Sequence, residues 1–112
     1  MGIFAKGDIV IAPLDFSDFS NFKRRPALVV AAPKEVDPIL CMITSRGRND
    51  GYDVSITKAD FASGGLRIDS YIRTCHLFSI DERMIEYQAG KLKETKIKEV
   101  IEKLVALLKE TA

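Results

Sequence analysis

The chain has 112 residues, 46% hydrophobic and 29% charged, with a formal net charge of +1, a composition typical of globular proteins. The near-zero net charge excludes a polycation that coats nucleic acid indiscriminately. Since no apolar run approaches the roughly 20 residues of a membrane helix and the start MGIFAKGD lacks a signal-peptide core, we expect one cytoplasmic domain spanning residues 1–112.

The first two-thirds of the chain predict about five β-strands. Four segments are apolar or alternating runs bounded by turn residues: 8–14, 26–32, 38–45 and 52–58. Residues 70–80 can form one long bent strand or two short ones, and residues 58–66 (KADFASGGL) predict a turn or a short helix. Several short strands at close spacing are typical of a small barrel.

The C-terminal segment changes to a helical period. From about residue 95 to 110 the apolar positions form one stripe: Ile97, Val100, Ile101, Leu104, Val105 and Leu108. Thr95 precedes this stripe and is a candidate N-cap. We therefore expect a mainly β fold with a C-terminal α-helix that packs on the barrel.

Arginine and lysine are distributed unevenly along the chain. Six of the seven arginines lie between positions 24 and 73, whereas six of the ten lysines lie from Lys91 onward. Arginine offers a planar fork that suits phosphate, while lysine on a helix flank mainly supplies solubility. Any anion site therefore belongs to the first two-thirds of the chain.

Within that part, basic residues recur at predicted strand ends. The run Lys23-Arg24-Arg25 precedes the second strand, Arg46 and Arg48 follow the third, and Arg73 lies within the fifth. In a small barrel such strand ends lie close enough for these clusters to converge on one anionic ligand. The equally simple alternative is a set of solvated, charged loops.

Hydroxyl and aromatic side chains accompany the basic clusters. Thr44 and Ser45 directly precede Arg46, which suits either a phosphate contact or a turn cap. Phe16, Phe19 and Phe22 alternate with polar residues in the loop before the second strand. Aromatic side chains beside arginines favour base stacking, but they can equally plug the mouth of a barrel.

The sequence contains no recognisable motif for other kinds of catalysis. Cys41 and Cys75 fit no zinc spacing and are interpreted as buried free thiols. His76 has no evident serine or cysteine partner in the sequence, which favours a structural role. The chain has no phosphate-binding glycine loop, no dinucleotide motif and no paired metal-binding histidines, so we expect neither a cofactor nor a metal.

Taken in order, KGDIVIAPL, KRRPALVV, MITS, DSYIRTCHLFSID and QAGKL resemble a MazF/PemK-type toxin, the RNA-cleaving half of a bacterial toxin–antitoxin pair. The resemblance runs from Gly7 to Leu108. It implies a small SH3-like (CcdB/PemK-like) β-barrel, a homodimer and a cognate antitoxin. It also implies sequence-specific, metal-independent cleavage of single-stranded RNA, in which the ribose 2′-hydroxyl attacks the phosphate and leaves a 2′,3′-cyclic phosphate and a 5′-hydroxyl.

The resemblance also implies roles for individual residues. Three residues are expected to be catalytic: Arg25, Thr44 and, from the PemK-like branch, Arg73. From their place in the basic clusters and the first loop, seven more residues are expected to bind RNA: Phe19, Phe22, Lys23, Arg24, Ser45, Arg46 and Arg48.

The chain departs from the family pattern at the expected acid–base positions. The first loop reads SNFKRR, without the acid or histidine of some relatives, and Cys75 stands where the PemK-like branch has an aspartate. The general base therefore stays open between Asp15, Asp18, Cys75 and a water molecule. Two alternatives to the nuclease remain: a non-catalytic SH3-like RNA-binding module, and a CcdB-like gyrase-binding toxin, which relies on a C-terminal tryptophan that this chain lacks.

Overall fold

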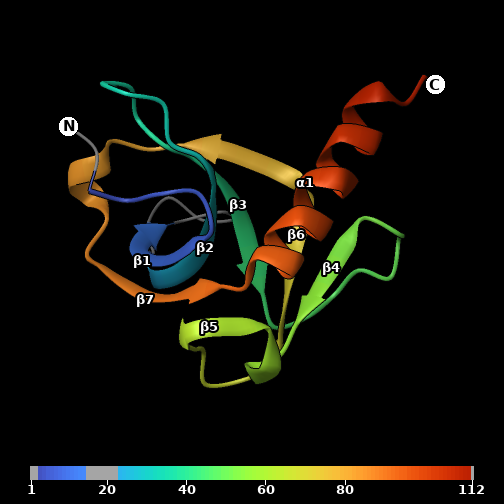
Figure 1. Ribbon diagram of the computed structural model, residues 1–112, viewed down its shortest axis with the longest axis horizontal. Helices are drawn as coiled ribbons and strands as arrows, with labels where there is room; N and C mark the ends of the chain where they lie inside the picture. Colours follow the sequence, from blue (N-terminus) through green and yellow to red (C-terminus); the bar gives the residue numbers. More distant parts are fainter. Residues whose placement is uncertain (1–2, 15–22, 112) are drawn as a thin grey trace.

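The computed structural model describes residues 3–14 and 23–111, which form one seven-stranded antiparallel sheet and a C-terminal helix (Figure 1). The helix α1 covers Glu94–Lys109, and two short 3-10 turns cover Lys58–Asp60 and Glu82–Met84. The strands are β1 (Asp8–Leu14), β2 (Lys23–Ala31), β3 (Ile39–Thr44), β4 (Asp53–Ile56), β5 (Phe61–Gly64), β6 (Ser70–Ser79) and β7 (Tyr87–Leu92).

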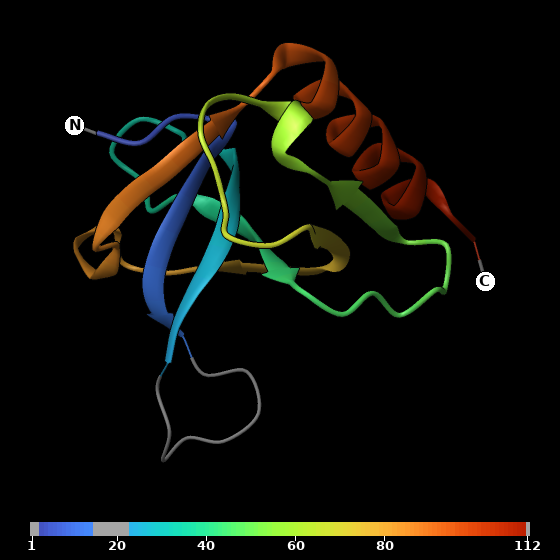
Figure 2. The same cartoon turned by 90° about the horizontal axis from the view of Figure 1, so that it is seen from below.

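The strand order in the sheet is β4-β6-β3-β2-β1-β7-β5. Register shifts interrupt four of the six strand pairings: β1 with β7, β2 with β3, β3 with β6, and β5 with β7. Because each bulge bends its strand and increases the local twist, the sheet curls into a half-barrel. Figure 2 shows this curl, with α1 lying alongside β4. The prediction of a mainly β fold with one C-terminal helix is confirmed.

Each face of the curled sheet carries its own apolar cluster. On one face, Ile97, Val100 and Leu104 of α1 pack against strand residues that include Ile9 and Leu28. The other face buries a second cluster: Val10, Ala12, Leu14, Ala27, Val29, Leu40 and Ile85. Since side chains alternate along a strand, a position in β2 can be assigned to the helix-covered face or the opposite face by its spacing from Leu28.

Several predicted boundaries were wrong. The sequence predicted about five strands, and both β5 and β7 were missed. The basic run Lys23-Arg24-Arg25 belongs to β2 itself, because β1 continues alongside it and pairs with it up to Lys23. Residues 70–79 form one strand with a bulge, which settles the alternative left open.

The helix begins one residue earlier than predicted, at Glu94. Lys93 is its N-cap, and its side chain makes no capping hydrogen bond. Thr95 therefore lies within the first turn, and the prediction that it caps the helix was wrong. None of the helical segments within residues 3–14 and 23–111 has the length and apolar character needed to cross a membrane.

Candidate functional site

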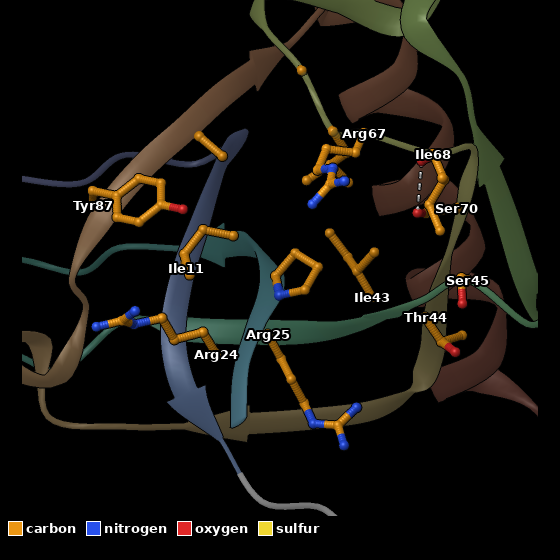
Figure 3. Close-up of a pocket in the computed structure, with 14 residues that line it drawn as sticks. Ile11, Arg24, Arg25, Ile43, Thr44, Ser45, Arg67, Ile68, Ser70 and Tyr87 are labelled. Atoms are coloured by element: carbon orange, nitrogen blue, oxygen red, sulfur yellow. Dashed lines mark hydrogen bonds between the residues drawn. The ribbon is translucent and has the colours of Figure 1, made fainter. Parts of the chain in front are cut away.

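A pocket of about 620 Å³ opens on the same face of the sheet as α1. Its apolar lining includes Ile11, Pro26 and Ile43 from three neighbouring strands (Figure 3). The strand register places Ile11 of β1 beside Pro26 on one side and Tyr87 on the other, so these residues form a row across the sheet. Leu66, Ile68 and Ala89 complete the apolar lining.

Polar side chains surround this apolar lining. Four of the ten predicted site residues lie together here: Arg24, Arg25, Thr44 and Ser45. Three further polar residues, Arg67, Ser70 and Tyr87, also line the pocket and were missed from the sequence. The distribution of arginine did include Arg67, but no predicted strand end singled it out, and the strand that carries Tyr87 was not predicted.

Arg24 and Arg25 project from opposite faces of β2. Arg24 shares the face of Pro26, and its Nε lies 2.7 Å from Oε1 of Glu86. The Arg24 side chain is 73% exposed, so solvent screens this ion pair strongly. Arg25 shares the face of Ala27 and is half-buried. In Figure 3, Arg24 points toward Tyr87, whereas Arg25 leaves the ribbon in another direction.

Thr44 and Arg25 lie just beyond the last paired residues of β3 and β2, and both line the pocket. Ala27 of β2 pairs with Met42 of β3, and continuing this register by two residues places Arg25 opposite Thr44 on the same face of the sheet. The Thr44 hydroxyl oxygen accepts the Arg46 backbone N–H at 3.2 Å, so its hydroxyl hydrogen can be donated to another group. A guanidinium and a hydroxyl on neighbouring strands can contact one anion together.

Arg73 lies on the same face but outside the pocket. It pairs with Met42 of β3 and Asp53 of β4, which places it diagonally from Thr44. Its Nη1 donates to Oδ1 of Asp53 at 2.6 Å and to both carboxylate oxygens of Asp50 at 3.0 and 3.1 Å. The Arg73 side chain is only 12% exposed. One guanidinium between two carboxylates leaves a local excess of negative charge, which disfavours a phosphate.

The Arg73 ion pairs anchor the loop between β3 and β4. The backbone N–H of Arg48 donates to Oδ2 of Asp53 at 2.6 Å, and that of Tyr52 donates to Oδ1 of Asp50 at 3.1 Å. The Tyr52 amide and then Arg73 lower the pKa of Asp50, while Asp53 and Asp50 raise the pKa of Arg73. Arg46 and Arg48 are exposed on this loop, and neither lines the pocket.

Several other predicted residues do not reach the pocket. Lys23 begins β2 and is exposed. Cys75, a candidate base, is also exposed and does not line the pocket, so the prediction that both cysteines are buried was wrong. The loop residues Asp15, Phe16, Asp18, Phe19 and Phe22 lie outside the described residues.

The surroundings of Cys41 and His76 favour a structural role for both side chains. Cys41 is fully buried in β3, and desolvation raises the pKa of its thiol to about 12. His76 stacks edge-on against Phe78, with ring centroids 5.7 Å apart, and burial followed by the charge of Arg73 lowers the pKa of its imidazole. Across the part of the chain that the structure describes, no three His, Cys, Asp or Glu side chains are grouped to hold a metal ion.

Comparisons with known proteins agree with this architecture. Residues 5–108 match the family model described as "PemK-like, MazF-like toxin of type II toxin-antitoxin system". No curated protein matches the sequence significantly.

Three solved structures illustrate the fold similarity. The Mycobacterium tuberculosis toxin MazF-mt6 is 21% identical, with a TM-score of 0.72 over 94% of this chain and 99% of that chain. MazF from Deinococcus radiodurans is 23% identical, with a TM-score of 0.73 over 98% and 100%. A mycobacterial endoribonuclease in complex with its cognate antitoxin is 12% identical, with a TM-score of 0.70 over 96% and 97%.

Proposed function

The chain belongs to the PemK-like, MazF-like toxin family of type II toxin–antitoxin systems, and from this membership we propose that it is an endoribonuclease that cleaves single-stranded RNA. Its cleavage is sequence-specific, needs no metal and takes place in the cytoplasm, where it inhibits translation and growth. The observation that carries the proposal is that Arg25 and Thr44, which the extended register of β2 and β3 places opposite each other, line one nucleotide-sized pocket.

In the proposed reaction the ribose 2′-oxygen attacks the adjacent phosphorus. The bond from phosphorus to the 5′-oxygen breaks, which leaves a 2′,3′-cyclic phosphate and a 5′-hydroxyl that takes up a proton. Negative charge builds on the phosphate oxygens in the transition state, where the Arg25 guanidinium and the Thr44 hydroxyl stabilise it as fixed donors.

The general base lies elsewhere, because arginine stays protonated in proteins. Cys75 does not line the pocket, which favours an acid of the first loop, Asp15 or Asp18, or a water molecule.

The remaining cationic and aromatic residues hold the RNA strand in this proposal. Lys23, Arg46 and Arg48 are exposed beside the Arg25–Thr44 pair and attract the phosphates of flanking nucleotides. Ser45 and Arg24 contact RNA from the rim of the pocket, and Phe19 and Phe22 stack on bases. Arg73 positions the β3–β4 loop rather than the scissile phosphate, because its Nη1 already donates to both Asp50 and Asp53.

We further propose that the toxin is a homodimer that binds a cognate antitoxin. Solved structures of similar proteins include MazE–MazF from Deinococcus radiodurans and an endoribonuclease with its cognate antitoxin. Apolar side chains available for such contacts are Ile39 and Leu77 on the adjacent strands β3 and β6, and Val105 and Leu108 on α1.

Incubation of the purified protein with single-stranded RNA in EDTA tests the proposed activity. We expect cuts at a short sequence motif, with 3′ ends that accept a poly(A) tail only after the cyclic phosphate is removed. RNA that is bound but left intact would contradict the proposal and favour a non-catalytic RNA-binding module. DNA breaks that depend on gyrase would favour the CcdB-like alternative.

A further inference from the structure

We propose that Arg67 and Tyr87 form a guanine-binding subsite beside the Arg25–Thr44 pair. This inference rests on the proposed function, since it names the base that the cleavage site selects. It is carried by the placement of these two side chains over the apolar lining of the pocket.

Residues 65–70, the segment that carries Arg67 along one side of the pocket, are held by hydrogen bonds at both ends. The backbone N–H of Gly65 donates to the carbonyl oxygen of Ala89 in β7 at 3.2 Å. The hydroxyl of Ser70, which is buried, donates to the carbonyl oxygen of Ile68 at 3.1 Å. Arg67 lies between these two anchors, so its backbone is held in place before any ligand binds. Such preorganisation lowers the entropic cost of recognition.

The close approach of β5 and β7 brings residues 65–70 to the pocket. A Cβ atom on Gly64 would lie 2.2 Å from the carbonyl oxygen of Ala89, and one on Gly90 would lie 2.7 Å from that of Ser63. Only glycine allows the two strands to pack this tightly. Tyr87 and Ala89 are two positions apart on β7, so they share the face that looks onto the pocket.

The Arg67 side chain turns into the pocket toward Ile43, and the Tyr87 hydroxyl points inward from the opposite side (Figure 3). Arg67 makes no hydrogen bond or ion pair with any residue within 3–14 and 23–111. Tyr87 is 55% exposed, which leaves much of its ring accessible to a ligand. An apolar lining with an aromatic ring beside it suits the flat face of a base better than a hydrated phosphate.

The polar groups around the pocket select for acceptors on that base. The described lining residues include no carboxylate and no side-chain amide, so hydroxyl and backbone carbonyl oxygens are the acceptors at the pocket, and Arg67 adds guanidinium donors. Guanine presents two adjacent acceptors, O6 and N7, which a guanidinium can engage together. Adenine and cytosine place an exocyclic amino donor at the corresponding edge, where Arg67 offers it no acceptor.

Mapping of the cleavage motif is the first test. The wild-type chain should cut a randomised single-stranded RNA pool with guanine preferred at one fixed offset from the break. Arg67→Ala should reduce this preference about tenfold while other motif positions stay the same, and Arg67→Gln should shift it toward adenine. Arg83→Ala, an exposed arginine paired with Asp81 and outside the pocket lining, is the matched control and should keep the motif. An unchanged guanine preference in Arg67→Ala overturns the subsite.

A binding experiment separates the subsite from the cleavage activity. Isothermal titration calorimetry measures nucleotide binding to the unsubstituted chain. Guanosine monophosphate should bind with at least about fivefold higher affinity than the three other ribonucleoside monophosphates, which share its phosphate. Arg67→Ala should remove the difference.

Equal affinities for the four nucleotides would overturn the subsite, whether or not the chain cuts RNA. Guanine selectivity in a chain that leaves RNA intact would support the subsite and contradict the proposed nuclease.

Discussion

Arg24 and Arg25 are adjacent in the sequence, yet the alternation of β2 gives them different surroundings. Arg24 lies on the face of Pro26 and pairs with Glu86, whereas Arg25 lies on the face of Thr44. A guanidinium can bridge two phosphate oxygens, and a lysine ammonium at the same place supplies only a point charge. The two arginines should therefore differ in their tolerance of substitution.

Arg25→Ala should reduce the cleavage rate at least about a hundredfold, on the order of 3 kcal/mol or more of transition-state stabilisation. Arg25 is half-buried near the start of β2 and belongs to neither apolar cluster, so the variant should fold. Single-turnover cleavage of a short RNA, with circular dichroism as the check on folding, measures the effect.

Lysine substitutions at the two positions provide the contrast. Arg25→Lys keeps the charge but loses the two-point contact, so it should remain badly impaired. Arg24→Lys should have a mild effect, visible mainly as a changed salt dependence of RNA binding. If Arg25→Lys cleaves RNA as fast as the parent, the assignment of Arg25 to the scissile phosphate is wrong.

The β3–β4 loop depends on Arg73, and charge removal at this position separates positioning from catalysis. Arg73→Gln leaves Asp53, whose side chain is only 8% exposed, without its countercharge and should lower the free energy of unfolding by about 3 kcal/mol. Adding Asp53→Asn removes the stranded charge and should recover part of that loss. A positioning role predicts that cleavage recovers together with stability in the double variant. Cleavage that stays lost while stability returns would mean that Arg73 contacts the phosphate itself.

Acid should loosen the same loop through Asp50. The pKa of Asp50 is lowered from its ordinary value of 3.8, so its contribution is fully present above that value and is lost as pH falls through the lower folded-state pKa. The Tyr52 amide, which donates to Asp50, reports this by its nuclear magnetic resonance shift. The shift should stay constant near pH 6 and move as pH falls below about 4. A Tyr52 amide that does not respond to acid would contradict the role of Asp50.

The contact between β5 and β7 predicts unequal effects at two neighbouring glycines. Gly64 has φ +65°, and a Cβ there would lie 2.2 Å from the carbonyl oxygen of Ala89, whereas a Cβ on Gly65 meets nothing within 4 Å. Gly64→Ala should therefore cost on the order of 2 kcal/mol in unfolding free energy, and Gly65→Ala should stay within about 0.5 kcal/mol. Urea denaturation measures both. Equal midpoints for the two variants would show that the strands can separate without cost.

These glycines also explain what the sequence could not predict. β2 and β3 were found because their apolar runs are continuous, but β5 and β7 contain glycines that resemble turn residues and here allow close strand packing. Arg25 and Thr44 were predicted as site residues from local position and family resemblance, and both line the pocket. Arg67 and Tyr87 were missed because they lie on separate segments that the pairing of β5 with β7 brings to one pocket, and no local pattern encodes such long-range pairing.

At the scale of the whole molecule, exposed apolar side chains indicate further contacts. Ile39 and Leu77 are each 38% exposed on adjacent strands, and Leu108 at the end of α1 is 71% exposed. The helical stripe predicted from the sequence therefore buries Ile97, Val100 and Leu104 against the sheet and leaves Val105 and Leu108 exposed. Such surface is available for association of two copies or for an antitoxin.

The proposed homodimer is tested by sedimentation. We expect a dimer at micromolar concentration, since a closed two-fold contact is the commonest way for a small chain to cover exposed apolar surface. Leu77→Asp should shift the equilibrium toward monomer, because it places a charge in an apolar contact, whereas Ile3→Asp, at an exposed site outside the sheet, should leave it unchanged. A wild-type monomer at every concentration would contradict the proposal.

The antitoxin should compete with RNA for the same cationic surface. Arg25 is half-buried in β2, Arg46 and Arg48 are exposed on the loop after β3, and a cationic surface of this kind can bind either RNA phosphates or an acidic segment of a protein partner. Adding antitoxin to toxin loaded with a fluorescent RNA that lacks the scissile 2′-hydroxyl should release the RNA, with a decrease in anisotropy. Arg25→Ala should lower the affinity for both RNA and antitoxin. Arg83→Ala, outside the pocket lining, should change neither affinity. A ternary complex that retains full RNA affinity would place the antitoxin on a different surface, and the exposed residues of α1, Val105 and Leu108, would then be the next to test.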